Sequence, residues 1–123
     1  TNSVSCTSAF SQKAAAAAIQ GPQDSVKMML EEFKTRSKIV VDGFNEIKGV
    51  SCIKPKGAFY AFPNIKDTGY KSQELSDALL NQGVAVLPGT SFGKFGEGYL
   101  RISFANSREN LRKALNIIKE FLD

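Results

Sequence analysis

The sequence predicts an α+β fold in which helices cover a small mixed or antiparallel sheet. Two patterns support this prediction. Apolar residues recur at helical spacing near both ends of the chain, and short runs of β-branched and aromatic residues lie between those segments. The 123 residues are 42% hydrophobic and 23% charged, which is ordinary for a globular domain. The chain is therefore long enough for one domain with a hydrophobic core.

Two helices are expected first. Residues 8–20 are rich in alanine, which has the highest helix propensity, so a short helix should end at Gly21. From residue 23 to residue 48 the apolar side chains fall at spacings of three, four or seven. This predicts one long amphipathic helix that Pro22 opens and Gly49 ends. That helix would span roughly 40 Å, more than so small a domain needs, and we expect it to join two bodies.

Four short strands are expected in the second part of the chain, where β-branched and aromatic residues cluster between glycines and prolines. They are expected over residues 50–54, 58–62, 84–88 and 99–105. The first two should form a β-hairpin or another tight connection. The third should be buried, and the glycine-rich residues 88–98 that follow it predict a flexible loop.

Two further helices complete the prediction. One should begin with Ser72 as its N-cap and stop at Gly83. The other should open with a variant of the capping box, Asn106 to Glu109. Its apolar side consists of Leu111, Leu115, Ile118 and Leu122.

Composition excludes several classes of partner. The net charge of +4 comes from basic residues that are scattered rather than grouped with aromatic ones, so we expect no nucleic-acid partner. No apolar run approaches the roughly 20 residues of a membrane span, and the first residues lack the pattern of a signal peptide. We therefore expect a soluble cytoplasmic protein whose two cysteines, Cys6 and Cys52, are reduced thiols. Because it begins at Thr1 in a polar stretch, we expect a fragment of a longer protein.

Common catalytic groups are missing. The sequence has no histidine, which removes the commonest general base and the commonest metal ligand. The glycine-rich residues 88–98 match no phosphate-binding motif, and the acidic residues do not pair in a pattern that indicates acid–base chemistry. We therefore expect no metal site and no self-contained enzyme.

Arg101 lies in the middle of a predicted strand. Alternation assigns Leu100, Ile102 and Phe104 to the core face and Arg101 to the other face. A partly buried guanidinium needs a counter-charge, and its planar fork of donors matches the carboxylate of a ligand. An exposed strand arginine or an internal salt bridge is the commoner explanation on physical grounds alone, and spacing does not decide between these alternatives.

Several segments carry a longer pattern, and through them the chain resembles the C-terminal part of class I aminotransferases, the pyridoxal-phosphate enzymes related to aspartate aminotransferase. The matching segments are Pro55–Tyr60, Gly83–Gly93, Arg101–Ala105 and Asn110–Leu111, together with Phe10, Gln12, Ala14 and Ala15. The resemblance covers essentially the whole chain.

The resemblance implies a role for the chain within a larger enzyme. Residues 1–21 would pack on a large domain that binds most of the pyridoxal phosphate, and residues 22–123 would form the small C-terminal domain. The reaction would transfer an amino group from an amino acid to a 2-oxo acid, in a homodimer. No lysine here is assigned the role of the family's cofactor lysine, so no catalytic or cofactor-binding residue is named and the chain alone should be inactive.

The resemblance also implies substrate-binding residues. Arg101 matches the arginine that binds the α-carboxylate of the substrate. Phe59 matches a position near the substrate, although an aromatic residue in a strand more often belongs to the core. Ser5 falls near the segment through which one subunit reaches its neighbour's active site, but the wording SVSCTS departs from the commoner pattern.

Other functions remain open on sequence grounds. The chain could be a stand-alone α+β module that binds or senses amino acids, although its long apolar helix argues against independence. It could belong to a pyridoxal-phosphate lyase or synthase on the same scaffold, or serve as a purely structural interaction domain. The amino-acid donor is not predicted.

Overall fold

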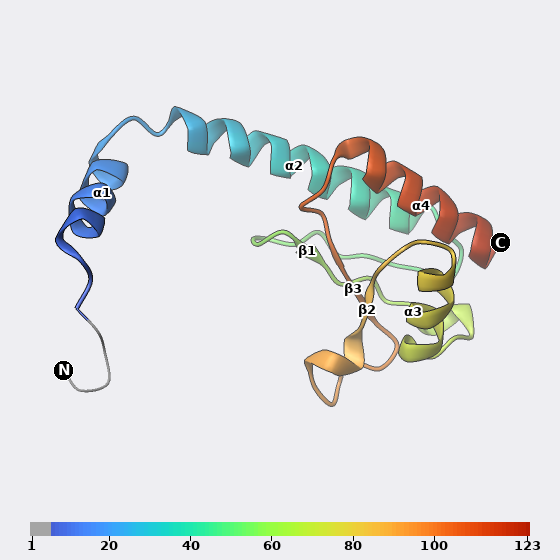
Figure 1. The fold of residues 1–123 in the computed structure, drawn as a ribbon. Helices are drawn as coiled ribbons and strands as arrows, with labels where there is room; N and C mark the ends of the chain where they lie inside the picture. Colours follow the sequence, from blue (N-terminus) through green and yellow to red (C-terminus); the bar gives the residue numbers. More distant parts are fainter. Residues whose placement is uncertain (1–5) are drawn as a thin grey trace. The chain divides into compact units, whose positions relative to one another are not determined.

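Residues 6–123 are described by a computed structural model of the chain (Figure 1). Their α-helices are α1 (Ala9–Gln20), α2 (Asp24–Asn45), α3 (Ser72–Asn81) and α4 (Arg108–Leu122). The strands are β1 (Tyr60–Ala61), β2 (Leu87–Pro88) and β3 (Leu100–Ser103), and two short 3-10 helices are η1 (Lys66–Thr68) and η2 (Gly89–Phe92). The chain divides into two units, Thr1–Glu31 and Glu32–Asp123.

The first unit contains α1 and the first turns of α2. No residue of α1 is buried, and its two largest apolar side chains, Phe10 and Ile19, are exposed. The apolar residues in the first turns of α2 are exposed as well, among them Met28. Among the described residues, no helix is both long enough and apolar enough to cross a membrane.

The sheet of the second unit is antiparallel, with β3 between β1 and β2. Tyr60 of β1 is paired with Ser103, and Leu87 of β2 is paired with Arg101. Along β3, Leu100 and Ile102 are buried whereas Arg101 is half-buried and Ser103 is exposed. The predicted alternation is confirmed, and one face of the sheet belongs to the core while the other is open.

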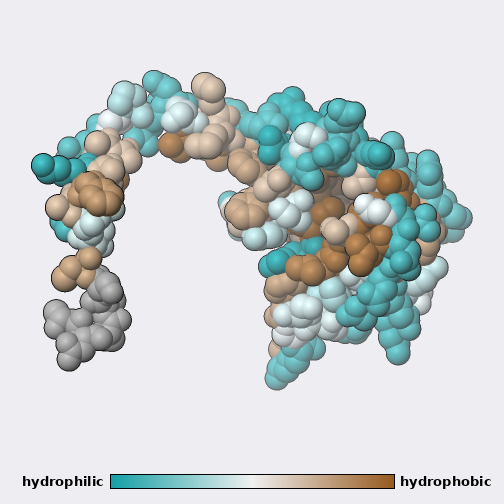
Figure 2. Space-filling model, in the orientation of Figure 1, coloured by the Kyte–Doolittle hydropathy of each residue, from teal (hydrophilic) through white to brown (hydrophobic). Residues whose placement is uncertain are grey.

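Helices supply the rest of the core. Within the second unit, the later part of α2 lies beside α4 on one side of the strands (Figure 1), and they pack closely at Gly43, where an added Cβ would lie 2.5 Å from a methyl carbon of Leu115. The outer surface of α4 is hydrophilic, and apolar side chains gather beside it (Figure 2). The largest buried side chains of the core are Phe44, Phe104, Ile65, Leu75, Leu79, Leu100 and Ile118. The predicted fold class, helices over a small antiparallel sheet, is confirmed.

The predicted hairpin is wrong. Residues 50–54 form no strand, and only Ser51 makes a bridge, to Asn64 rather than to residues 58–62. At the other edge of this segment, the side chain of Asn45 takes the place of a strand: its Oδ1 accepts from the Cys52 N–H at 2.8 Å and its Nδ2 donates to the Cys52 carbonyl at 3.0 Å. Residues 60–61 pair with β3 instead.

Three predicted helix starts are shifted. Ser72 is the first residue of α3 and not its N-cap, which is Lys71, because the Ser72 hydroxyl bonds to the loop before β3. The N-cap of α4 is Ser107, whose hydroxyl accepts from the Asn110 N–H at 3.1 Å, so the capping box expected from Asn106 does not form. Helix α2 begins two residues after Pro22.

The third strand and the glycine-rich loop differ in detail from the prediction. The third strand is only two residues long, and its Leu87 is exposed although Val84 and Val86 before it are buried. The glycine-rich loop contains η2.

Cys6 and Cys52 are free thiols, as predicted. The boundary between residues 21 and 22 concerns packing on a larger domain, and it stays a prediction.

Candidate functional site

Arg101 occupies the central strand of the sheet, on the face opposite the core. Its neighbours along β3, Leu100 and Ile102, point into the core and are 1% and 6% exposed, which anchors the strand and fixes the side on which Arg101 projects. Two aromatic side chains also reach Arg101, Tyr60 from β1 and Phe92 from η2, which follows β2. The sheet therefore sets the position of the guanidinium.

Aromatic rings surround the Arg101 guanidinium. Its Cζ lies 4.4 Å from the ring centroid of Tyr60 and 3.9 Å from that of Phe92. A guanidinium over an aromatic face is attracted by the ring quadrupole, and Arg stacks on such faces more readily than Lys. The rings contact the group without using its hydrogen-bond donors.

No acidic group neutralises Arg101 within residues 6–123, and its guanidinium donates no hydrogen bond there. Its nitrogen atoms are also accessible, because no fully buried side-chain nitrogen or oxygen of the described residues lacks a partner. A half-buried cation with accessible, unused donors is suited to bind an anion from outside the chain.

The rings beside Arg101 form part of a larger group, which we call the aromatic cluster: Tyr60, Phe62, Phe92 and Tyr99. Phe62 meets Phe92 edge to face at 6.3 Å between centroids and stacks on Tyr99 at 5.4 Å. The Lys66 ammonium lies 4.9 Å from the Tyr99 centroid. Since Phe62 and Phe92 are each at least 40% exposed, the cluster forms an open surface rather than a second core.

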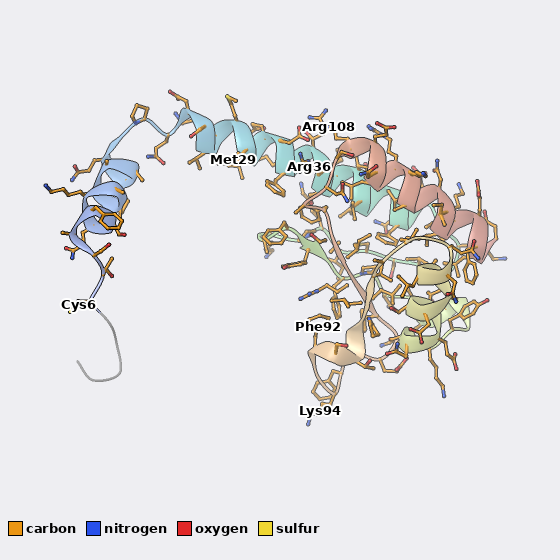
Figure 3. The ribbon with its side chains drawn as sticks, viewed as in Figure 1. Cys6, Met29, Arg36, Phe92, Lys94 and Arg108 are labelled. Carbon is orange, nitrogen blue, oxygen red and sulfur yellow. The ribbon has the colours of Figure 1, made fainter. Side chains whose placement is uncertain are left out.

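The loop that carries Phe92 is tightly held. In Figure 3, Phe92 lies on the part of the loop nearest the strands and Lys94 at its far end. Backbone crosses backbone at Gly89 and Gly96, where a Cβ on Gly96 would lie 1.9 Å from the Gly89 carbonyl oxygen. The Gly89 N–H also donates to the Tyr99 carbonyl at 2.8 Å. Only glycine allows this close approach.

Ser72 and Glu97 fasten the same loop to α3. The Ser72 hydroxyl accepts from the backbone N–H groups of Gly98 and Tyr99, at 2.9 and 3.2 Å. The Glu97 carboxylate accepts from the Ser72 N–H at 2.9 Å and from the Gly98 N–H at 3.0 Å. These bonds, the one from Ser72 first, lower the pKa of Glu97. Hydrogen bonds to α3 thus fix the residues directly before β3, and with them the start of the strand that carries Arg101.

Phe59 lies at the edge of this surface. Its side chain is 41% exposed, and its ring centroid lies 4.4 Å from that of Tyr60 and 6.3 Å from that of Phe33. Its carbonyl accepts from the Phe104 N–H at 2.9 Å. Phe59 is therefore not a core residue, and it contacts a ring that touches Arg101. Ser5 lies outside the described residues.

A second charged group lies near the start of the second unit. The Glu32 carboxylate accepts from Arg36 at 2.8 Å and from both Nε and Nη2 of Arg108, which is the first residue of α4 (Figure 3). These hydrogen bonds, above all the one from Arg108, lower the pKa of Glu32 from 4.5 to about 2. Each of these guanidinium groups already has a carboxylate, so this group joins two helices rather than awaiting a ligand.

Other chemistry is absent from the described part of the chain. No three His, Cys, Asp or Glu side chains in residues 6–123 are grouped so that they could hold a metal ion. Burial raises the pKa of the Cys52 thiol, so it is a poor nucleophile.

Sequence reasoning identified Arg101 and Phe59 as candidate site residues. It did not predict that the rings of Tyr60 and Phe92 contact Arg101. Tyr60 could have been found from register, since it shares a face with Ser103 two residues beyond Arg101. Phe92 had no such signal, because a 3-10 turn and a glycine crossing bring it back to the sheet.

Known proteins resemble the chain over nearly its full length. The family model for aminotransferase class I and II matches residues 1–118. An aspartate aminotransferase of Pyrococcus abyssi is 45% identical over 120 residues, which cover 95% of this chain and 31% of that relative.

Solved structures agree with that match. A crystal structure of an aromatic aminotransferase from Pyrococcus horikoshii has a TM-score of 0.89 at 43% identity and covers 95% of this chain and 32% of that one. The aspartate aminotransferase of Rhizobium meliloti has a TM-score of 0.89 at 36% identity, with 99% and 33% covered. The chain thus spans about a third of the length of these relatives. The resemblance found in the sequence is confirmed, and the chain belongs to the class I and II aminotransferase family.

Proposed function

We propose that the chain is the small domain of a longer aminotransferase, and that Arg101 binds the α-carboxylate of the amino-acid and 2-oxo-acid substrates. The observation that carries the proposal is the state of Arg101: half-buried and in contact with two rings, with no carboxylate partner among residues 6–123. The relatives at 36–45% identity are named aspartate and aromatic aminotransferases, whose substrates all carry an α-carboxylate.

Arg101 would contribute both binding energy and orientation. A carboxylate that accepts two parallel N–H bonds from one guanidinium is fixed in plane and direction, which a lysine ammonium does not achieve. Holding the acid group fixes the rest of a small amino acid relative to the reacting atoms. Phe59 and the aromatic cluster beside it would exclude water from one side of that contact.

Pyridoxal phosphate supplies the covalent chemistry in such an enzyme when it is bound. The described residues do not fit it by themselves: Lys66 lies beside the aromatic cluster, but its ammonium contacts the face of the Tyr99 ring. We therefore assign cofactor binding to the remainder of the longer protein.

The remaining assignments follow from the same proposal. Residues 1–21 would pack on the large domain and residues 22–123 would form the small domain. The enzyme would be a cytoplasmic homodimer, in which Ser5 lies close to the neighbouring subunit's site. The exposed Phe10 and Ile19 of α1 are consistent with such packing, since apolar side chains of this size usually need a cover.

The test is substitution of Arg101 in the complete enzyme, with L-aspartate and L-tyrosine as amino donors. For the donor that the wild type uses, Arg101→Ala should lower kcat/KM at least about thirtyfold, because an unpaired carboxylate costs about 2 kcal/mol or more. The absorbance of the bound cofactor should not change.

Arg112→Ala is the matched control, since Arg112 is exposed on α4 and should have no effect on turnover. Arg101→Lys should recover only part of the loss, because an ammonium cannot form the planar pair of bonds. Wild-type kinetics in Arg101→Ala would remove Arg101 from the substrate site.

A further inference from the structure

We propose that Phe92 is a positioning residue: together with Tyr60 it holds the Arg101 guanidinium over the faces of the two rings, so that its N–H donors stay free for a carboxylate. This inference rests on the proposed function, because it assigns a role to Phe92 only if Arg101 binds a substrate. It concerns a residue outside the sheet, contributed by the loop between β2 and β3.

Contact geometry provides the first argument. The distance from Cζ of Arg101 to the centroid of Phe92 is 3.9 Å, which is close to the van der Waals contact distance of stacked groups. Phe92 is thus nearer to the guanidinium than Tyr60 is, at 4.4 Å. A ring against the face of a guanidinium restricts the rotation of the long side chain, which otherwise loses rotamer entropy when it binds a ligand.

Charge provides the second argument. An acidic side chain at the same place would also hold Arg101, but it would occupy the donors and cancel the charge. The Glu32 carboxylate does this to Arg108 in this same chain, through Nε and Nη2. Aromatic rings hold the group while leaving its in-plane donors and its positive charge for an incoming carboxylate.

The third argument is that Phe92 is itself held in place. Its ring packs edge to face on Phe62, which stacks on Tyr99. The 3-10 turn that carries it begins at the Gly89–Gly96 crossing, and the other side of that loop is fastened to Ser72. A side chain with so many constraints, yet 46% exposed, is better explained by a surface function than by core packing.

Phe92 also permits a clean experiment. Phenylalanine has no polar atom, so its substitution removes neither a hydrogen bond nor a proton donor. Phe92→Leu keeps an apolar side chain but removes the aromatic face, and Phe92→Tyr restores that face. Phe95→Leu is the matched control, since Phe95 lies in the same loop, is 84% exposed and contacts Lys94 rather than Arg101.

The experiment measures these variants in the complete enzyme, with whichever of L-aspartate and L-tyrosine the wild type uses. Phe92→Leu should raise the KM for that donor about three- to tenfold, with kcat changed much less, as expected for loss of one cation–π contact. Phe92→Tyr should have a KM close to that of the wild type, and Phe95→Leu should not change it.

A second readout reports on the guanidinium itself. The NMR signal of the Arg101 Nε–H should be displaced by the ring currents of the neighbouring rings. It should move toward the position of a free arginine in Phe92→Leu but not in Phe95→Leu. A purely structural role for Phe92 would lower the thermal midpoint without moving this signal or the KM.

The outcomes separate the two proposals. If Arg101→Ala impairs the enzyme while Phe92→Leu changes neither the KM nor the Arg101 signal, the role of Phe92 is refuted and the proposed function stands. If Arg101→Ala has no effect, the proposed function fails, whatever Phe92 does. A rise in KM of the same size in Phe95→Leu would also refute the inference, since the loop rather than the ring would then be responsible.

Discussion

Arg101 and Arg108 show two opposite environments for the same side chain. Arg108 donates from Nε to both oxygens of Glu32, at 3.1 Å each, so it already forms the bond that a substrate carboxylate would offer. Arg101 instead contacts two rings and no acid within the described residues. At the scale of the residue, the two arginines differ in whether their hydrogen-bond donors are already used within the described residues.

The pKa of Glu32 leads to a prediction about acid stability. The pKa is lowered from 4.5 to about 2, so folding favours the charged form. The stabilisation is complete above the ordinary pKa and is lost as the pH falls from about 4.5 toward 2. In Glu32→Gln this contribution is absent at every pH. The difference in free energy of unfolding between wild type and variant should therefore shrink over that range.

Urea unfolding of the chain at a series of pH values measures this difference. Glu120→Gln is the control, because Glu120 is exposed on α4 and forms no ion pair within the described range 6–123. A difference that stays constant down to the lowest pH would show that the carboxylate of Glu32 is not stabilised by Arg108 and Arg36.

At the scale of elements, the loop between β2 and β3 brings a ring back onto the sheet. Its crossing at Gly89 and Gly96 leaves no room for a side chain, since a Cβ on Gly96 would lie 1.9 Å from a backbone oxygen, which cannot move independently. The hydrogen bonds from Gly98 and Tyr99 to Ser72 then direct the chain into β3. The position of Phe92 depends on that crossing.

Gly96→Ala should therefore destabilise the chain by about 1 to 3 kcal/mol, as other overpacking substitutions do. In the complete enzyme it should also raise the KM for the amino donor, because the turn that carries Phe92 is displaced. Gly57→Ala is the control, since a Cβ there meets no atom within 4 Å and should change stability by less than about 0.5 kcal/mol. Thermal and urea unfolding would measure both, and equal stability of the two variants would contradict the close crossing.

An element could be predicted from the sequence where the residues that determine it lie close together in the chain. Helix α4 repeats its apolar residues every three or four positions, and Leu111, Leu115 and Ile118 are buried as expected. The alternation of buried and more exposed residues around Arg101 could be predicted because it also depends on consecutive residues. The strand expected at residues 50–54 was wrong: Ser51 alone makes a bridge, to Asn64, and the backbone of Cys52 bonds to the side chain of Asn45, which no local pattern reveals.

The candidate site followed the same rule. The alternation predicted the face on which Arg101 lies, and the family resemblance predicted its role; both are written in consecutive residues. Its contact with Phe92 depends on a glycine crossing and on Ser72, which lies 26 residues before Gly98. Tertiary packing fixes long-range contacts of this kind. The side chains that surround a residue are therefore harder to predict than the face of the sheet on which the residue lies.

At the scale of the whole molecule, the proposal gives the chain a substrate-binding role and assigns the reactive group of the family to the rest of a longer protein. It spans about a third of the length of its relatives, and none of its lysines is assigned the role of the family's cofactor lysine. Apolar side chains in the first unit, such as Phe10 and Ile19, are nearly 80% exposed. The chain alone should therefore have unsatisfied apolar surface and no place to attach the cofactor.

We expect the 123-residue chain to show no transamination of L-aspartate or L-tyrosine when pyridoxal phosphate is added, whereas the complete enzyme turns over. The physical reason is that Arg101 can fix an acid group but cannot move a proton or form a covalent bond to the cofactor. Formation of the 2-oxo acid measures turnover, and mass spectrometry after borohydride reduction measures covalent attachment. The control is the chain mixed with the rest of the enzyme as a separate polypeptide, which should recover activity only if the Arg101 site is intact. Turnover by the chain alone, or recovery by an Arg101→Ala chain equal to that of the wild type, would contradict this division of labour.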